Sequence, residues 1–465
     1  HQLAISIIRN SNQKKRGLTF KNKNSLVDKF ILSLPFALTK SQKDVWEEIK
    51  IDLKSENQMV RLLQGDVGSG KTIIAIISML FAIDSGFQAA IMVPTSILAN
   101  QHFQNIYNLL KKFSVSTLIL TGKDKGKARI EKNLKISNGE AKIIIGTHAL
   151  IQDDVNFKNI GMVIIDEQHR FGVFQRMAFS FKGKKPSILV MSATPIPRTL
   201  SLAAYGDMDE SRIIEKPLGR LPIKTTSLKF SKEKILIERL KNKLKIKEKA
   251  YWICPLVEES EELDLKAATI RYENLNKIFK NKVLLIHGRL KEKEKEKVMD
   301  RFQREDFKIL VATTVIEVGI DIKEATTIII EHAERFGLAQ LHQLRGRVGR
   351  NDLQSSCILM HKDSIGENAK KRINKMKETN NGFEIAEEDL KIRGAGEVLG
   401  RKQSGLPSFK IADLSFDSDL LEDSRSYVLN IIEKDPNLKT IEGANLKNLL
   451  YLFERDIALK TLMAG

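Results

Sequence analysis

The chain has 465 residues, too many for one hydrophobic core, so two or three domains are expected, and its hydrophobic content of 42% is ordinary for a soluble globular protein. The net charge of +19 and the pI of about 9.6 favour a polyanionic partner, nucleic acid above all, over an unspecific basic surface. Two distant cysteines exclude a disulfide framework and suit a reducing cytoplasm, and no apolar run is long enough to span a membrane.

The amino-terminal stretch is expected to be helical. Residues 1–16 are predicted as the end of a helix, because Leu3, Ile5, Ile7 and Ile8 form an apolar pattern before the basic run NQKKR. Residues 17–34 follow as a connector. Because the chain opens at His1 inside this apolar pattern, we expect a fragment whose amino-terminal part is missing.

Short apolar runs alternate with amphipathic stretches from about residue 40 to 220. The strand candidates are rich in β-branched residues and bounded by Gly, Asp, Ser or Pro, and they are MVRLL, AAIMV, STLIL, KIIIG, MVIID and SILVMS. Such alternation predicts a parallel sheet covered by helices on both faces.

A second α/β region follows the linker EKPLGRLP at 215–222. Its strand candidates are AYWICPL, KVLLIHG, FKILVATT and ATTIIIEHA. The charged run KEKEKEK at 291–297 is predicted as a solvated helix face. From about residue 365 the pattern becomes mostly helical and more polar.

The segment LLQGDVGSGKT predicts a phosphate site. It places the pattern G-x-x-x-x-G-K-[ST], from Gly65 through Gly70 to Lys71 and Thr72, between a strand candidate and an apolar helix. These glycines, with Gly68, let backbone N–H groups face phosphate oxygens, and the helix amino terminus adds partial positive charge. We expect Lys71 to reach the β- and γ-phosphates and the Thr72 hydroxyl to hold Mg²⁺.

The segment GMVIIDEQHR predicts the residues of the same site that bind the metal ion and activate the attacking water. Asp166 and Glu167 follow four apolar residues, at the carboxyl end of a strand, where ligands bind in parallel sheets. We expect Asp166 to bind Mg²⁺ and Glu167 to act as the base or to position water for attack on the γ-phosphate. The alternative is a carboxylate pair that caps the next helix.

The segment HQLRGRVGR at 342–350 holds three arginines with interleaved glycines. An arginine can neutralise the charge that phosphoryl transfer leaves on the equatorial oxygens, and Arg347 and Arg350 are the candidates. The alternative is a basic turn that binds nucleic-acid phosphate.

In this order, the motifs resemble those of the superfamily 2 helicases over roughly residues 35–360. They are LTKSQ, GDVGSGKT, VPTSILANQH, GTHAL, DEQH, MSATPIPRTL, IHGRL, TTVIEVGIDI and QLHQLRGRVGR. The resemblance implies an α/β fold of two tandem RecA-like domains with parallel sheets, at 35–220 and 221–364, that use ATP and Mg²⁺. It also implies the end of a connecting helix and a linker at 1–34, and a mostly helical translocation-motif region at 365–465.

Within that superfamily the chain resembles the RecG family, DNA helicases that remodel stalled replication forks. DEQHRFGVFQR, ATPIPRTL, HGRLKEKEKEKVMDRF and SGLPSFKIADL carry the likeness. Ala395 departs from it, because a proline is usual there, and RGAG at this place is similar to the transcription–repair coupling translocase Mfd. The expected fragment lacks the family's amino-terminal wedge, an OB-fold that splits the fork junction.

The resemblance implies roles for further residues. Gln42 reads adenine with Phe36 nearby, and Gly319 and Asp321 contribute to the nucleotide site from the second domain. Other residues are implied to lie along the DNA strand or to couple it to the nucleotide state, and they are Pro94, Thr95, Thr147, His169, Ser192, Thr194, His287 and Thr313. Taken singly, each also fits packing or helix capping.

The stretch GFEIAEEDLKIRGAGEVLG resembles the family's translocation motif, in which a helical hairpin and a loop couple domain closure to movement on duplex DNA. Its glycines supply hinges, and Arg393 and Gln403 are implied to contact the second domain or the DNA backbone. The alternative is a long loop packed on the surface.

We therefore expect an ATP-dependent helicase or translocase that remodels branched duplex DNA, such as stalled forks and Holliday junctions, in recombination and repair. The expected partners are this DNA and a single-stranded-DNA-binding protein, and the expected state is a cytoplasmic monomer without membrane contact. Two rivals stay open, an Mfd-like translocase and a nucleic-acid-binding protein that keeps the fold without hydrolysing ATP.

Overall fold

The protein divides into two compact units. Unit 1 comprises His1–Gly65, Ser69–Glu215 and Leu390–Gly465, and unit 2 comprises Asp66–Gly68 and Lys216–Asp389. The structure, a computed structural model, describes residues 2–13, 17–21, 25–166, 185–197, 208–217, 221–244, 248–255, 261–313, 322, 324–349, 353–393 and 417–453.

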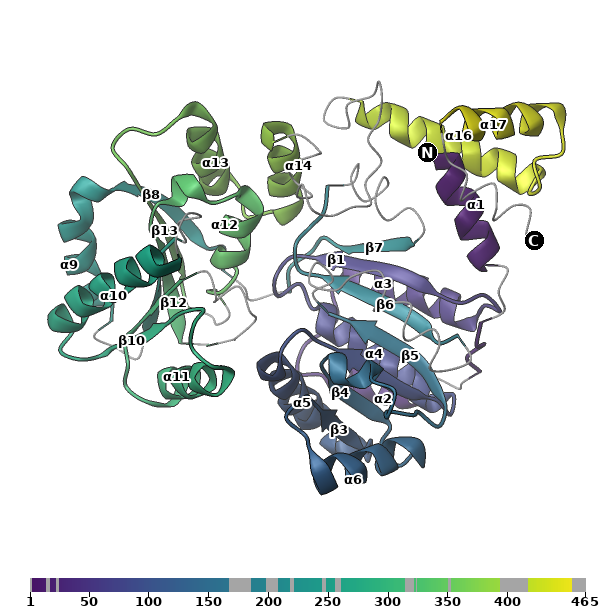
Figure 1. The fold of residues 1–465 in the computed structure, drawn as a ribbon, viewed down its shortest axis with the longest axis horizontal. Helices are drawn as coiled ribbons and strands as arrows, with labels where there is room; N and C mark the ends of the chain where they lie inside the picture. Colours follow the sequence, from purple (N-terminus) through teal and green to yellow (C-terminus); the bar gives the residue numbers. More distant parts are fainter. Residues whose placement is uncertain are drawn as a thin grey trace. The chain divides into compact units, whose positions relative to one another are not determined.

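Unit 1 is built on a seven-stranded sheet in the order β3-β4-β2-β5-β6-β1-β7, in which each neighbouring pair is parallel (Figure 1). The strands are β1 (Val60–Gly65), β2 (Gln88–Met92), β3 (Thr117–Leu120), β4 (Ile143–Gly146), β5 (Ile160–Ile165), β6 (Ser187–Ser192) and β7 (Asp209–Ile213). The predicted apolar runs form β1 to β6, so the parallel sheet is confirmed. The edge strand β7, with the polar sequence DESRI, was not predicted.

The helices that pack on this sheet are α3 (Lys40–Lys54), α4 (Lys71–Asp84), α5 (Ser96–Leu110) and α6 (Gly126–Ser137), and α2 (Ser25–Ser33) packs on α4. Two short 3₁₀ turns are η1 (Lys111–Phe113) and η2 (His148–Ile151). Helix α4 is almost entirely buried, because it contacts both α2 and α3 as well as β1, β2 and β5. The stretch expected as a connector contains α2, which buries Val27 and Phe30.

Unit 1 also contains three helices from the two ends of the chain. They are α1 (Gln2–Gln13), α16 (Ser418–Lys434) and α17 (Ile441–Leu452), and α1 contacts both of the others (Figure 1). Leu3 and Ile7 of α1 are buried against Val428 and Ile432 of α16 and Leu450 of α17. The apolar pattern at the start of the sequence is therefore one face of this small helical core.

Unit 2 is built on a six-stranded parallel sheet in the order β10-β11-β9-β12-β13-β8. The strands are β8 (Lys224–Lys229), β9 (Lys249–Ile253), β10 (Val283–Ile286), β11 (Ile309–Ala312), β12 (Ala325–Ile330) and β13 (Ser356–His361). The predicted runs form β9 to β12. The strands β8 and β13, at one edge of the sheet, were not predicted.

The helices of unit 2 are α9 (Glu233–Lys243), α10 (Glu261–Ile278), α11 (Glu292–Arg304), α12 (Leu338–Arg345), α13 (Glu367–Glu378) and α14 (Gly382–Arg393), with 3₁₀ turns η4 (Phe230–Lys232) and η6 (Ala333–Arg335); the last turn of α14 groups with unit 1. The charged run 291–297 lies at the start of α11 and is mostly exposed, as predicted. Of the described helices, none has the length and apolar character needed to cross a membrane.

Candidate nucleotide site and its surroundings

The candidate phosphate and metal residues of unit 1 lie at one edge of its sheet. Strand β1 ends at Gly65, β5 is followed by Asp166, and β6, which lies between these two strands, ends at Ser192. Gln64 pairs in register with Ser192. Because all three strands are parallel, these residues share the carboxyl edge, where parallel sheets bind ligands.

The phosphate loop joins β1 to α4 and has the backbone that its glycines predict. Gly68 and Gly70 have φ values of +75° and +95°, in the left-handed region that favours glycine. Lys71 is the first residue of α4, is only 8% exposed, and donates from Nζ to the Gly65 carbonyl at 2.6 Å. The Lys71 side chain therefore extends back across the phosphate loop to its first residue.

Gln42 holds this loop from α3. Its backbone N–H donates to Thr39 Oγ1, and its side-chain Oε1 accepts from the Thr39 N–H at 3.0 Å, so that the pair forms the capping box of α3. Its Nε2 donates to the Ser69 carbonyl at 2.8 Å. An amide carries two donor hydrogens and two acceptor lone pairs, so the predicted contact with adenine is compatible with these bonds. Phe36, predicted beside it, is 47% exposed.

Replacing Gly70 by Ala is expected to destabilise the protein more than a matched change elsewhere. A Cβ at Gly70 would lie 2.2 Å from Gln42 Nε2, which is buried and bonded to Ser69. Gly86 is the control, because its φ of +87° is similar but a Cβ there would meet nothing within 4 Å. We expect Gly86→Ala to cost about 1–2 kcal/mol of unfolding free energy, and Gly70→Ala about 1–3 kcal/mol more. Urea denaturation measures both, and equal losses would show that the clash is relieved at no cost.

Asp166 is held at the carboxyl edge by two contacts. Its backbone N–H donates to the Met92 carbonyl at 2.9 Å, and its Oδ2 lies 3.0 Å from Nε2 of His102. His102 lies on α5 and is 9% exposed. Sequence reasoning missed this histidine, although it ends the quoted motif VPTSILANQH, because nothing in the spacing indicates that α5 and β5 meet there.

In unit 1, the described residues predicted to lie along the DNA strand, or to couple it to the nucleotide state, are found at or just after the ends of β2, β4 and β6. Thr95 caps α5, with Oγ1 accepting from the Leu98 N–H at 3.3 Å, and Thr147 follows β4 and is 3% exposed. Ser192 Oγ donates to the Thr194 carbonyl at 2.8 Å and lies 3.1 Å from its hydroxyl. The Thr95 side chain thus has a structural role as the cap of α5, while Ser192 and Thr194 are hydrogen-bonded to each other. Pro94 immediately follows β2 and Val93.

His287 and Thr313, the candidates in unit 2, lie at the ends of neighbouring strands. They follow β10 and β11, and the Thr313 N–H donates to the Ile286 carbonyl at 3.3 Å. His287 Nδ1 and Thr313 Oγ1 are buried and have no hydrogen-bond partner within the described part of the chain. Burial, followed by the nearby charges of Lys295 and Arg289, lowers the pKa of His287. The two residues therefore lie at neighbouring strand ends, and their role along DNA stays a prediction.

Two arginines of the segment HQLRGRVGR are described, and both are buried. Arg347 is 4% exposed and Arg345 is 2% exposed. The guanidinium of Arg345 donates to the carbonyls of Met376 and Thr379 at 2.8 and 2.9 Å, and its Nη2 lies 2.9 Å from His342 Nδ1. These bonds give Arg345 a structural role and leave Arg347 as the described candidate for phosphate.

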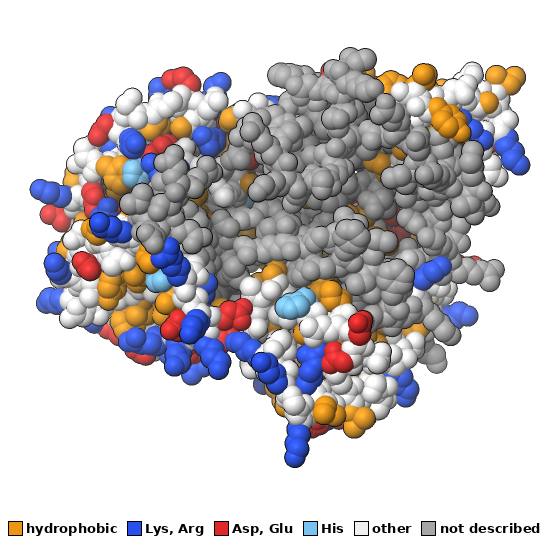
Figure 2. All heavy atoms as spheres, in the orientation of Figure 1, with side chains coloured by type: hydrophobic (Ala, Val, Ile, Leu, Met, Phe, Trp, Pro, Cys, Tyr) orange, Lys and Arg blue, Asp and Glu red, His pale blue; other side chains and the backbone are white. Residues whose placement is uncertain are grey.

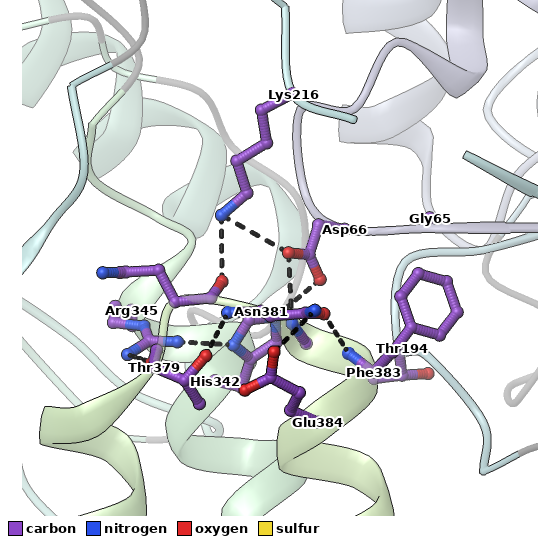
Figure 3. A network of polar contacts seen from close by, with 12 residues as sticks. Gly65, Asp66, Thr194, Lys216, His342, Arg345, Thr379, Asn381, Phe383 and Glu384 are labelled. Carbon is purple, nitrogen blue, oxygen red and sulfur yellow. Dashed lines mark hydrogen bonds and ion pairs between the residues drawn. The ribbon is translucent and has the colours of Figure 1, made fainter. Parts of the chain in front are cut away.

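Asp66, in the phosphate loop, belongs to a polar network of unit 2 (Figure 3). Its Oδ1 lies 3.0 Å from His342 Nε2, its Oδ2 accepts from the Gly382 N–H at 3.2 Å, and Lys216 Nζ lies 3.4 Å from Oδ2. Burial alone would raise the pKa of Asp66, but the hydrogen bond from His342 and the nearby positive charge of Lys216 lower it. The carboxylate is therefore ionised at neutral pH. Sequence reasoning assigned no role to it.

Several predicted residues lie outside the described part of the chain. They are Glu167, His169, Gly319, Asp321, Arg350 and Gln403. Arg393 ends α14, and only its backbone is described. The roles predicted for these residues stay predictions.

The described residues fit a nucleotide with Mg²⁺. Gly70 precedes α4 as its N-cap residue and supplies no side-chain cap, and Ser69 Oγ is a buried polar atom without a hydrogen-bond partner among the described residues. Uncapped N–H groups at a helix amino terminus favour an anion such as phosphate. The Asp166 carboxylate and the Thr72 hydroxyl are the hard oxygen ligands that Mg²⁺ takes from proteins, which usually supply one or two carboxylates.

Three families match successive parts of the chain. The DEAD/DEAH box helicases match residues 39–202, the helicase conserved C-terminal domain matches 231–352, and the ATP-dependent DNA helicase RecG, domain 3, C-terminal, matches 379–457. A curated relative named ATP-dependent DNA helicase RecG, from Bacillus subtilis (strain 168), is 47% identical over 97% of this chain and 66% of its own length. Another of that name, from Escherichia coli O157:H7, is 43% identical over 94% of this chain and 64% of its own.

Solved structures agree with these matches. A structure of RecG bound to a three-way DNA junction has a TM-score of 0.76 and 45% identity, over 90% of this chain and 55% of that one. Dbp5 of S. cerevisiae bound to RNA and ADP BeF3 has a TM-score of 0.56 at 18% identity, over 87% of this chain and 97% of that one, which shows the fold alone. The chain thus spans less than two thirds of the length of its RecG relatives.

Proposed function

Because this chain belongs to the RecG family, we propose that it is an ATP-dependent DNA motor that remodels branched duplex DNA in recombination and repair. The observation that carries the proposal is the loop from Gly65 to Lys71, which joins a buried parallel strand to an uncapped helix. The relatives named ATP-dependent DNA helicase RecG support an ATP-dependent helicase, and the RecG structure bound to a three-way DNA junction supports a branched DNA substrate.

The phosphate loop would bind the triphosphate, and the residues around it would prepare its hydrolysis. Lys71 would leave the Gly65 carbonyl to contact the β- and γ-phosphates, since a buried ammonium gains more from phosphate than from one carbonyl. Thr72 and Asp166 would hold Mg²⁺, which neutralises phosphate charge when bound. Glu167 would orient or deprotonate the attacking water, and Arg347 and Arg350 would stabilise charge on the transferred phosphoryl group.

The other predicted nucleotide and DNA contacts belong to the same proposal. Gln42 and Phe36 would recognise adenine, and Gly319 and Asp321 would complete the nucleotide site. Thr147 and the neighbouring pair His287 and Thr313 would lie along DNA. His287 Nδ1 and Thr313 Oγ1, which have no hydrogen-bond partner among the described residues, could bond to phosphate oxygens. Pro94 and Thr95 complete this set, while Ser192 and Thr194, with His169, would couple the grip on DNA to the nucleotide state. Arg393, at the end of α14, and Gln403, in the segment that follows, would couple the motor to duplex DNA.

Steady-state ATP hydrolysis with and without forked DNA tests the proposed function. We expect Mg²⁺-dependent ATP hydrolysis that forked DNA stimulates, because in a motor the conformational steps of the hydrolysis cycle are coupled to movement along DNA. Hydrolysis that DNA does not change would favour a different ATPase. Binding of forked DNA without any ATP hydrolysis would favour the alternative, a nucleic-acid-binding protein that keeps the helicase fold but does not hydrolyse ATP.

DNA affinity is expected to fall steeply with salt and to depend little on sequence. Lys and Arg side chains are scattered over the visible described surface rather than gathered at one point (Figure 2). A motor that tracks the backbone neutralises phosphates, and each one adds about −0.9 to the slope of log affinity against log salt on duplex DNA. Fluorescence anisotropy of two forks with unrelated sequences gives both results. A slope near zero, or affinities that differ strongly between the forks, would argue against backbone tracking.

The partner, the assembly and the domain limits complete the proposal. We propose contact with a single-stranded-DNA-binding protein, a monomeric state and a cytoplasmic location, where the two buried free cysteines, Cys254 and Cys357, stay reduced. We propose the domain limits 1–34, 35–220, 221–364 and 365–465.

A further inference from the structure

Asp66 presents a chemical problem for the phosphate loop. A loop that binds phosphate gains from positive potential, and an ionised carboxylate next to Gly65 opposes it. Asp66 is only 7% exposed, so solvent screens its charge poorly. A carboxylate at this place must therefore have strong partners of its own, and they lie in unit 2.

The first partner is the amino terminus of α14. The Gly382 N–H, in the first turn of α14, donates to Asp66 Oδ2 at 3.2 Å, while the next N–H, of Phe383, donates to Asn381 Oδ1 at 3.0 Å. A helix amino terminus has unsatisfied N–H groups and partial positive charge, so it stabilises a carboxylate. Asp66 and Asn381 thus each accept a hydrogen bond from one backbone N–H in the first turn of α14.

The second partner connects Asp66 to the end of α13. Arg345 Nη2 can only donate, so His342 Nδ1 accepts from it at 2.9 Å, and the remaining ring proton sits on Nε2, which donates to Asp66. Burial, with Arg345 nearby, lowers the pKa of His342, which agrees with this neutral form. Arg345 in turn binds the carbonyls of Met376 and Thr379.

The third partner is Lys216, where the chain enters unit 2. Its Nζ lies 3.4 Å from Asp66 Oδ2 and donates to the Asn380 carbonyl at 2.9 Å (Figure 3). Lys216 and His342 therefore both connect the carboxylate to residues 376–382, the junction between the consecutive helices α13 and α14. Three independent segments converge on one buried side chain of the phosphate loop.

We propose that Asp66 is a positioning residue that fixes the phosphate loop to the α13–α14 junction, so that nucleotide binding at the loop changes how well ordered this junction and the start of α14 are. The inference rests on the proposed function, because it needs a loop that binds nucleotide. It assigns to one carboxylate the link between the loop and α14, the helix that forms the first part of the stretch resembling the translocation motif.

Hydrogen exchange with mass spectrometry tests the link. In the parent protein, AMP-PNP with Mg²⁺ is expected to slow exchange in peptides that cover 379–389 by at least about fivefold, the lower range of coupling between sites. In Asp66→Ala, AMP-PNP still binds, but this slowing is lost, and the Gly382 amide exchanges at least about tenfold faster without nucleotide because its charged acceptor is gone. Fluorescence titration of the nucleotide measures binding separately.

Asp389→Ala is the matched control. Asp389 is a buried carboxylate of α14 that accepts from the Leu338 N–H at the start of α12, at 3.3 Å. Its loss weakens the same helices without touching the loop, so the response to AMP-PNP should persist. If Asp66 only stabilised these helices, Asp66→Ala and Asp389→Ala would show the same change of hydrogen exchange with AMP-PNP.

The outcomes separate the inference from the function on which it rests. A parent protein that binds no AMP-PNP overturns the proposed function, and the link falls with it. An Asp66→Ala variant that keeps the full slowing overturns the link alone, and one that loses nucleotide binding places Asp66 in the nucleotide site instead. Should Asp66→Ala not fold, Lys216→Gln tests the link through a half-exposed partner, with partial loss of slowing expected and an unchanged response contradicting the link.

Discussion

Replacing Lys71 by Ala is expected to reduce ATP turnover by at least about a hundredfold, the loss that follows removal of one strong donor to a reacting centre. The physical reason is that Lys71 is the lysine of the phosphate loop and begins the helix whose amino terminus faces the loop. DNA binding should persist, because the basic surface is spread over many residues. Steady-state hydrolysis and DNA anisotropy measure the two effects on one protein sample.

Lys112→Ala is the control for this variant. Lys112 lies in the short turn η1 of unit 1 and is exposed, so its loss removes one positive charge without touching the loop. It should hydrolyse ATP at the parent rate. A Lys71→Ala variant that does the same would mean that the phosphate site has been assigned to the wrong loop.

Glu167→Gln is expected to keep ATP binding and to lower hydrolysis by roughly a hundredfold to ten-thousandfold, the usual contribution of a general base. The change keeps the size of the side chain and removes its charge. Glu167 follows Asp166 in the sequence, and Asp166 lies at the carboxyl edge of the unit 1 sheet, where the metal ligands are proposed. Single-turnover hydrolysis and nucleotide titration separate the rate from the affinity.

Asp166→Asn supplies the contrast. Asp166 is the proposed ligand of Mg²⁺, so its loss should raise the Mg²⁺ concentration needed for nucleotide binding, whereas Glu167→Gln should leave it unchanged. The roles would be reversed if Glu167→Gln weakened binding and left turnover intact. His102 remains beside residue 166 in both variants, so the contrast concerns the carboxylates themselves.

The parallel sheets were predictable because buried strands carry their own signal. The runs AAIMV, KIIIG and MVIID are continuous and β-branched, since a strand buried on both faces has no polar side. The phosphate loop was predictable for a similar reason. Its glycines, lysine and threonine lie within eight consecutive residues, from Gly65 to Thr72.

The edge strands were missed because they are partly exposed and therefore carry mostly polar residues. Strand β7 is DESRI and β8 is KTTSLK, and β8 alternates between exposed and partly buried residues. An edge strand is hydrogen-bonded on one side only and tolerates polar residues, so apolar runs do not reveal it. Strand β13 is different, because its CILM core was a usable signal.

The polar networks could not be predicted because they join residues far apart in the sequence. Asp66 and His342 are 276 positions apart, and His102 and Asp166 are 64 apart. Each of these residues lies in a motif that was singled out, yet spacing along a chain says nothing about which motif residues meet. Gln42 shows the reverse, because its capping-box bond to Thr39 is local and recognisable as T-x-x-Q.

Displacement of the third strand from a DNA triplex tests the central claim, an ATP-driven motor on duplex DNA, most directly. The chain is loaded on a fork whose duplex arm carries a labelled third strand some way from the junction, and release of the label is followed in time. We predict release with ATP and Mg²⁺, none with AMP-PNP, and none for Lys71→Ala with ATP. ATP hydrolysis that DNA stimulates but that never releases the third strand would contradict a motor that moves along duplex DNA.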